Sequence, residues 1–126
     1  MDENQAGTLI VDSAVHLHQA LGPGLLESVY EVTLTRRLEK EGISVRRQVP
    51  VPIEFEGERF DEGFRAGLIV EGKVIVELKS VRRVDPAHKK QALTYLKLTD
   101  LKLGYLLNFG EALMKDGITR IIQGEL

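Results

Sequence analysis

The sequence has no cysteine and no tryptophan among its 126 residues. Without cysteine, disulfides and thiolate metal sites are excluded. Nor does the sequence contain a run of about 18 apolar residues, the length that a membrane-spanning helix needs. The acidic start "MDENQAG" lacks the basic and apolar regions of a signal peptide. These absences predict a cytoplasmic protein with no membrane partner.

What the sequence does contain is the balance of a globular protein, with 43% hydrophobic and 29% charged residues. The length fits one domain over residues 1–126. The formal net charge is −2, which by itself suggests no nucleic-acid partner. Basic residues nevertheless gather between Lys79 and Lys90, and two arginine doublets lie at 36–37 and 46–47. A local basic patch can bind phosphate on a slightly acidic protein. A solvated face without a partner is the alternative.

Two helices are predicted in the first third of the chain. The first covers residues 8–21, and its apolar stripe consists of Ile10, Ala14, Leu17 and Leu21. "GPG" at 22–24 ends it. The second covers residues 25–40, with a buried side formed by Leu26, Tyr30, Leu34 and Leu38. Gly42 follows its end, as is typical of a helix C-terminus.

Strands and one further helix are predicted for the rest of the chain. "SVRRQVPVPIEF" is expected at a sheet edge because of Pro50 and Pro52. Residues 59–70 form a strand in which one face carries Phe64, Ala66, Leu68 and Val70. "VIVELKS" follows as an internal strand, then a helix that begins after Asp85, and then the strands "LGYLLNF" and "ITRIIQ". This order predicts an α/β fold with a mixed β-sheet flanked by helices.

Polar residues on these elements suggest a site. Glu77 and Lys79 project from one face of the internal strand, and an isolated buried charge is costly unless it is paired or binds a metal. Glu27 lies on the second helix. The helix after Asp85 carries a polar side formed by His88, Gln91 and Tyr95. Two carboxylates beside a lysine could hold Mg²⁺ for phosphate chemistry.

Each of these residues also has a purely structural interpretation. Glu77 and Lys79 would form an ion pair on a wet sheet face. Glu27 would be an acid favoured by the helix dipole. His88 would be a polar surface residue, and Gln91 and Tyr95 would border the interface between helix and sheet.

The stretch "GLLESVY", with Gly24, Glu27 and Tyr30, resembles the signature of the GxxExxY protein family. The resemblance runs from about Val11 to Gln123. It includes further matches at Gln48, "VELK" (76–79), "HKKQALTYLK" (88–97) and "LGYLLNFG" (103–110). That family is similar to a compact branch of the PD-(D/E)XK nuclease superfamily. The resemblance therefore implies a nuclease-like fold and a nuclease site that depends on Mg or Mn.

By this resemblance, Glu77 and Lys79 correspond to the E-x-K motif, and Glu27 is the helix carboxylate that helps to hold the metal. Gln91 and Tyr95 would support the site or the nucleic acid. Phosphate contacts are expected from the basic segment, here Arg82, Arg83, His88, Lys89 and Lys90. The implied partner is nucleic acid, with DNA ahead of RNA. A homodimer or a protein partner is a further expectation.

The sequence departs from the family pattern at one decisive position. The frame "R-x-D-L-x-V" expects an aspartate as the principal metal ligand, and this chain has Gly67 in "RAGLIV". Loss of one ligand removes both charge and geometry from a metal site. We therefore expect an impaired or inactive nuclease. The alternatives are an isolated substitution in a working enzyme, a ligand relocated to another acid, or a binding module on the same fold.

The loop before Glu77 decides whether position 67 belongs to the site. A two-residue turn would pair Val70 with Lys73 and put Gly67 on the face away from Glu77. A three-residue loop, 71–73, would pair Val70 with Val74 and put Gly67 opposite Glu77. Gly72 suits both. We predict the second register, because the family site requires it. We also predict that Glu77 and Lys79 share a sheet face with the start of the second helix and Glu27.

Overall fold

The computed structural model describes all 126 residues. It contains three α-helices, one 3₁₀ helix (η1) and five strands. In chain order they are α1 (Glu3–Leu21), α2 (Glu27–Lys40), β1 (Val45–Phe55), β2 (Glu58–Val70), β3 (Val74–Lys79), α3 (Pro86–Thr99), β4 (Leu103–Asn108), η1 (Met114–Gly117) and β5 (Ile118–Ile122). None of the α-helices is long and apolar enough to cross a membrane.

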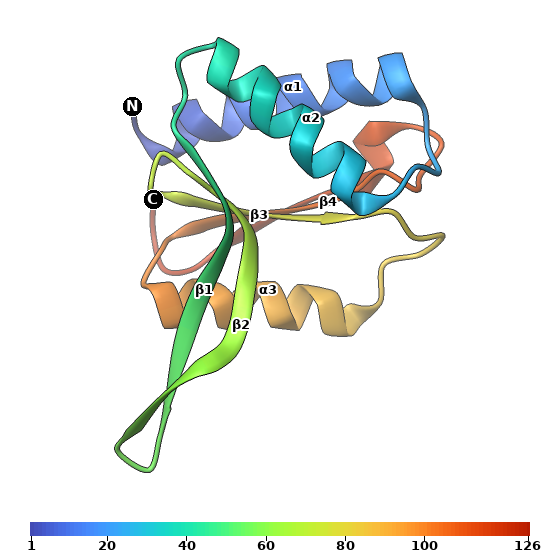
Figure 1. The fold of residues 1–126 in the computed structure, drawn as a ribbon. Coiled ribbons are helices and arrows are strands. Elements are labelled where there is room, and N and C mark those ends of the chain that lie inside the picture. Colours follow the sequence, from blue (N-terminus) through green and yellow to red (C-terminus); the bar gives the residue numbers. More distant parts are fainter.

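The five strands form one mixed sheet in the order β1-β2-β3-β4-β5. Only β3 and β4 are parallel, and α3 supplies the crossover between them. Helices α1 and α2 cover one face of the sheet and α3 covers the other (Figure 1). The predicted α/β class is confirmed, as is the internal position of "VIVELK" and the edge position of the strand with two prolines.

Alternate residues of β3 enter two different cores. Val74, Val76 and Leu78 pack in the core that α1 and α2 form with the sheet. Ile75 packs in the smaller core under α3, with Tyr95 and Leu96 among others. Burial on both faces explains why β3 is almost continuously apolar up to Glu77.

The two N-terminal helices begin and end differently from the predicted boundaries. A capping box between Asp2 and Gln5 starts α1 five residues earlier than the apolar stripe indicated. Helix α2 starts at Glu27, so Leu26 is its N-cap and is 74% exposed. Leu21 is 40% exposed. The assignment of Leu21 and Leu26 to the buried stripes is therefore wrong, because both lie where the chain turns between the helices.

The loop between β2 and β3 has the predicted three-residue form. Val70 pairs with Val74, Ile69 with Ile75 and Leu68 with Val76. Glu71 and Gly72 adopt positive φ angles of 54° and 63°, which close the turn. The next pair in this register is Gly67 opposite Glu77, so position 67 lies beside the strand that carries the E-x-K residues.

The predicted alternation along β2 fails at Gly67. Leu68 and Val70 contact the core of α1 and α2, but Ala66 belongs to the core under α3, and Phe64 packs against it. Opposite this point, Gln48 of β1 has a φ of 50°, a left-handed backbone that interrupts the regular ladder. Beyond the interruption the β1–β2 hairpin bends out of the sheet (Figure 1).

Tyr30 fastens the turn that joins α1 to α2. Its hydroxyl donates to Gly22 O at 2.6 Å and accepts from Leu25 N at 3.1 Å. Its ring is fully buried and stacks on Phe109, with 4.3 Å between the ring centroids. Tyr30 therefore holds the segment from which Glu27 projects.

Tyr30→Phe should lower the free energy of unfolding by about 1–2 kcal/mol, because it removes two hydrogen bonds and leaves the ring in place. Urea denaturation followed by circular dichroism measures the change. Tyr105→Phe is the matched control, since that buried tyrosine has no hydrogen bond at its hydroxyl and should change stability little. Equal losses in both variants would contradict the assigned role.

Candidate functional site

Glu77 is the acid whose surroundings are most unusual. It lies near the end of β3 and is partly buried. Its carboxylate accepts a hydrogen bond from Gly67 N at 3.1 Å. Burial raises the pKa of Glu77 to about 7 from 4.5, although the Gly67 N–H and the Lys79 ammonium act to lower it. Glu31 and then Glu27 raise it further. Glu77 therefore changes charge near neutral pH.

Lys79 does not form an ion pair with Glu77. The two ion pairs of the structure join Arg47 to Glu31 and Arg59 to Asp61. Lys79 acts on Glu77 only at longer range. The simple interpretation of Glu77 and Lys79 as a surface ion pair is therefore wrong, and Glu77 stays without a cationic contact.

Glu77 does not share a sheet face with α2. It alternates with Val76 and Leu78, which face α1 and α2, and so it projects to the side of α3. Its charge contributes to the raised pKa of Tyr95 on α3, after burial as the main cause. The expectation that Glu77 and Lys79 face Glu27 across one side of the sheet is wrong. Glu27 is exposed and influences Glu77 only electrostatically.

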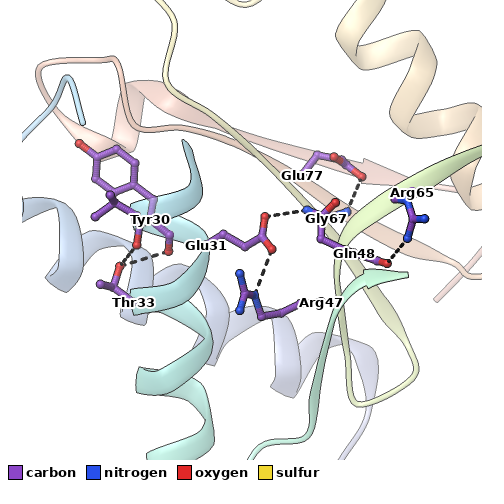
Figure 2. Close-up of polar contacts among 9 residues, drawn as sticks. Tyr30, Glu31, Thr33, Arg47, Gln48, Arg65, Gly67 and Glu77 are labelled. Atoms are coloured by element: carbon purple, nitrogen blue, oxygen red, sulfur yellow. Dashed lines mark hydrogen bonds and ion pairs between the residues drawn. The ribbon is translucent and has the colours of Figure 1, made fainter. Parts of the chain in front are cut away.

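Glu31, one helical turn after Glu27, is the α2 carboxylate that points at the sheet (Figure 2). It is 8% exposed and accepts from Arg47 Nε at 3.1 Å and from Gln48 Nε2 at 2.9 Å. The sequence analysis missed it. The available signal was its spacing of four from Glu27, which places both acids on one side of the helix.

Gly67 lies where Glu31 and Glu77 approach each other from different elements (Figure 2). A Cβ at this position would be 3.5 Å from Glu77 Oε2 and 3.1 Å from Val76 O. A short acidic side chain at 67 would therefore meet the carboxylate of Glu77, after a small adjustment of the strand. The prediction that Gly67 lies beside Glu77 is confirmed.

No other acid takes the place of an aspartate at 67. Asp61 pairs with Arg59 far along the β1–β2 hairpin, and Glu71 accepts from Ser44 N in the turn. Glu31 is occupied by its two partners. No three His, Cys, Asp or Glu side chains lie close enough to hold a metal ion together. The residues present therefore do not fit the Mg²⁺ or Mn²⁺ site that the superfamily implies.

The predicted residues of α3 have separate environments. Tyr95 is 8% exposed and stacks on Phe64 with 3.3 Å between ring centroids. Gln91 is exposed one turn earlier. His88 completes the capping box of α3, because Asp85 N donates to its Nδ1 at 3.2 Å. The structure brings Tyr95 near Glu77 and gives His88 a capping role.

The basic segment, residues 82–90, begins at the end of the central strands. Arg82, Arg83, Lys89 and Lys90 are exposed. Asn108, which is fully buried, fixes the start of the segment: its Oδ1 accepts from Val81 N and its Nδ2 donates to Val81 O. Sequence analysis did not identify Asn108, whose role depends on a contact across 27 residues.

A family model described as "PD-(D/E)XK nuclease superfamily" matches residues 4–121. The chain belongs to the PD-(D/E)XK nuclease superfamily. Its five-stranded mixed sheet between helices is consistent with that fold. Searches of curated proteins and of solved structures gave no match. Membership gives the superfamily and its fold.

The raised pKa of Glu77 predicts a dependence of stability on pH. Between pH 4.5 and about 7 the folded chain binds a proton that the unfolded chain releases, so stability falls as pH rises through this window. The fall is up to about 3 kcal/mol. Glu77→Gln should remove it and leave the variant more stable than the parent above pH 7.

Denaturant unfolding across this pH range measures the effect. Glu125→Gln, near the exposed C-terminal end, serves as the control and should keep the slope of the parent. A parent-like slope in Glu77→Gln would show that another group causes the dependence.

Proposed function

We propose that this chain is a nucleic-acid-binding PD-(D/E)XK nuclease domain whose hydrolytic activity is impaired or lost. The observation that carries the proposal is the pairing of Gly67 with Glu77. An intact site needs a second carboxylate there, and glycine supplies none. The impairment therefore follows from one position in an otherwise ordered site.

In the proposed site, Glu77 is the remaining metal-binding carboxylate and Lys79 the residue that would stabilise negative charge. Glu27 adds negative charge from the exposed start of α2, and Glu31 supports the β1 side through Arg47 and Gln48. Tyr95 and Gln91 line the α3 side. In an intact relative, Mg²⁺ or Mn²⁺ would polarise the phosphodiester and activate water. Since the donor set here is incomplete, we assign no hydrolytic step to this chain.

The proposed partner is nucleic acid, with DNA ahead of RNA, and the proposed contact is the basic segment. Its four exposed cations begin directly after the strand that carries Glu77 and Lys79. Such a surface binds phosphates through charge and hence without strong sequence preference.

A non-catalytic binding module on the same fold is the second candidate. The bonds of Glu31 to Arg47 and Gln48 favour it, because they neutralise a buried carboxylate without any metal. In that case the site residues would be retained for folding and for the shape of the binding surface.

Gly67→Asp should create binding of Mg²⁺ or Mn²⁺ and raise nuclease activity on DNA. Without metal it should lower the free energy of unfolding by about 1 kcal/mol, because two carboxylates would then oppose each other across the strands. Metal addition should restore the loss. Calorimetric titration, thermal unfolding with and without metal, and cleavage of labelled DNA measure the three effects.

Gly67→Asn is the matched control, with nearly the same shape and no charge. It should bind no metal and cleave no DNA. If Gly67→Asp folds, places its carboxylate beside Glu77 and still binds neither metal, the impaired-nuclease proposal fails and the binding module replaces it.

Reversing the charges of Arg82, Arg83, Lys89 and Lys90 should weaken DNA binding and flatten its salt dependence. On duplex DNA the slope of log affinity against log salt falls by about 0.9 for each phosphate that the protein no longer neutralises. Fluorescence anisotropy at several salt concentrations measures it. The control reverses four exposed lysines elsewhere, Lys40, Lys97, Lys102 and Lys115, with the same change in net charge. Equal effects of both sets would support a solvated face instead.

A further inference from the structure

The two faces of the sheet are covered unequally. Helices α1 and α2 lie on one face, whereas α3 alone lies on the other (Figure 1). A helix is about 10 Å across, and five strands span about 19 Å, so one helix leaves part of its face open. On the side of β1, the open part is a cavity of about 330 Å³ between β1 and the C-terminal end of α3. This volume is at the lower end of the range of small-molecule sites, about 300–1,000 Å³.

Apolar side chains form most of the wall of this cavity. Val49 and Val51 come from β1, Ile69 comes from β2, and Leu98 and Leu101 come from the end of α3 and the turn after it. Leu98 is 42% exposed, so this part of the wall is in contact with water. An apolar group in the cavity would remove that surface from water, which is favourable in proportion to the area buried.

Arg46 is the single charged residue that lines the cavity. It lies opposite Ile69 in the register of β1 and β2, so the two side chains share a face of the sheet. Arg46 is exposed and belongs to neither of the two ion pairs of the structure. No acid lines the cavity. The guanidinium is therefore free to bind an anion, and its planar shape suits a carboxylate.

The remaining polar residue types of the wall add no second charge. The hydroxyl of Thr99 already donates to Tyr95 O at 2.8 Å, and Pro50 and Pro52 have no N–H to donate. Arg46 is thus the lining side chain with free hydrogen-bond donors. A ligand that matches the wall has one anionic group at Arg46 and an apolar remainder.

We propose that this cavity binds a small organic carboxylate, with the carboxylate on Arg46 and an apolar chain or ring against Leu98 and Leu101. The cavity lies at the C-terminal end of α3, which is Thr99, whereas the basic segment includes the first residues of the same helix. The proposed binding therefore goes beyond the proposed function and does not depend on it.

Titration of the ¹⁵N-labelled parent with sodium octanoate, followed by amide chemical shifts, tests the proposal. Octanoate should bind with a dissociation constant on the order of 1 mM. The shifts should gather at Arg46, Val49 and Thr99. Octylammonium has the same chain and the opposite charge, and butanoate has the same charge and a short chain. Each should bind at least about tenfold more weakly, because each lacks one of the two matching features.

Two variants separate the contribution of charge from that of apolar contact. Arg46→Gln should weaken octanoate binding about tenfold and remove its advantage over octylammonium. Arg36→Gln is the matched control, since Arg36 is an exposed arginine on α2, and it should bind octanoate as the parent does. Leu98→Ser should weaken octanoate binding about tenfold and leave the binding of butanoate almost unchanged. Circular dichroism verifies that the variants fold.

Several results would overturn the proposal. One is the absence of saturable shifts at octanoate concentrations roughly tenfold above the expected dissociation constant. Others are equal binding of octylammonium, or shifts that gather at Arg82 and Arg83, where the basic segment would attract any anion. Parent-like affinity for octanoate in Arg46→Gln or in Leu98→Ser would also overturn it.

Discussion

The three-residue turn between β2 and β3 pairs Val70 with Val74 and thereby sets which side chains of the two strands meet. A turn shorter by one residue would exchange the faces of β2 relative to β3. The observed register sends Leu68 and Val70 into the larger core and brings Gly67 beside Glu77. The packing of α1 and α2 and the composition of the site thus depend on the same few backbone bonds.

The two acids near Gly67 are compensated very differently. Glu31 accepts hydrogen bonds from Arg47 and Gln48 of β1, and it is almost completely buried. Glu77 accepts one hydrogen bond, from Gly67 N, and Lys79 acts on it only at longer range. These two favourable interactions do not offset its burial, which raises the pKa of Glu77. A buried carboxylate is costly to ionise when it lacks a cation and has few hydrogen bonds. The asymmetry lies in the partners: Glu31 has an arginine and an amide, whereas Glu77 has a single backbone N–H.

Much of the fold could be predicted from local pattern. The helical stripes, the Asp85 cap and the internal strand each follow from residues that are close together in the sequence. The three-residue turn could also be predicted, once the family site was assumed. What could not be predicted depends on distant contacts. The burial of Glu31 requires Arg47 and Gln48, and the change of face between Ala66 and Leu68 requires the left-handed Gln48 on the neighbouring strand. The sheet face from which Glu77 projects was predicted wrongly for the same reason. Alternation along a strand shows which residues share a face, but it does not show which helix covers that face.

The prolines of β1 limit how the sheet can grow. β1 is an outer strand, and its unpaired edge would ordinarily offer backbone groups to a strand of another molecule. Pro50 and Pro52 have no N–H to donate, and a shift in strand register between Val51 and Ile53 makes the same stretch irregular. Fibrous stacking by strand addition is thus discouraged along this edge of the sheet.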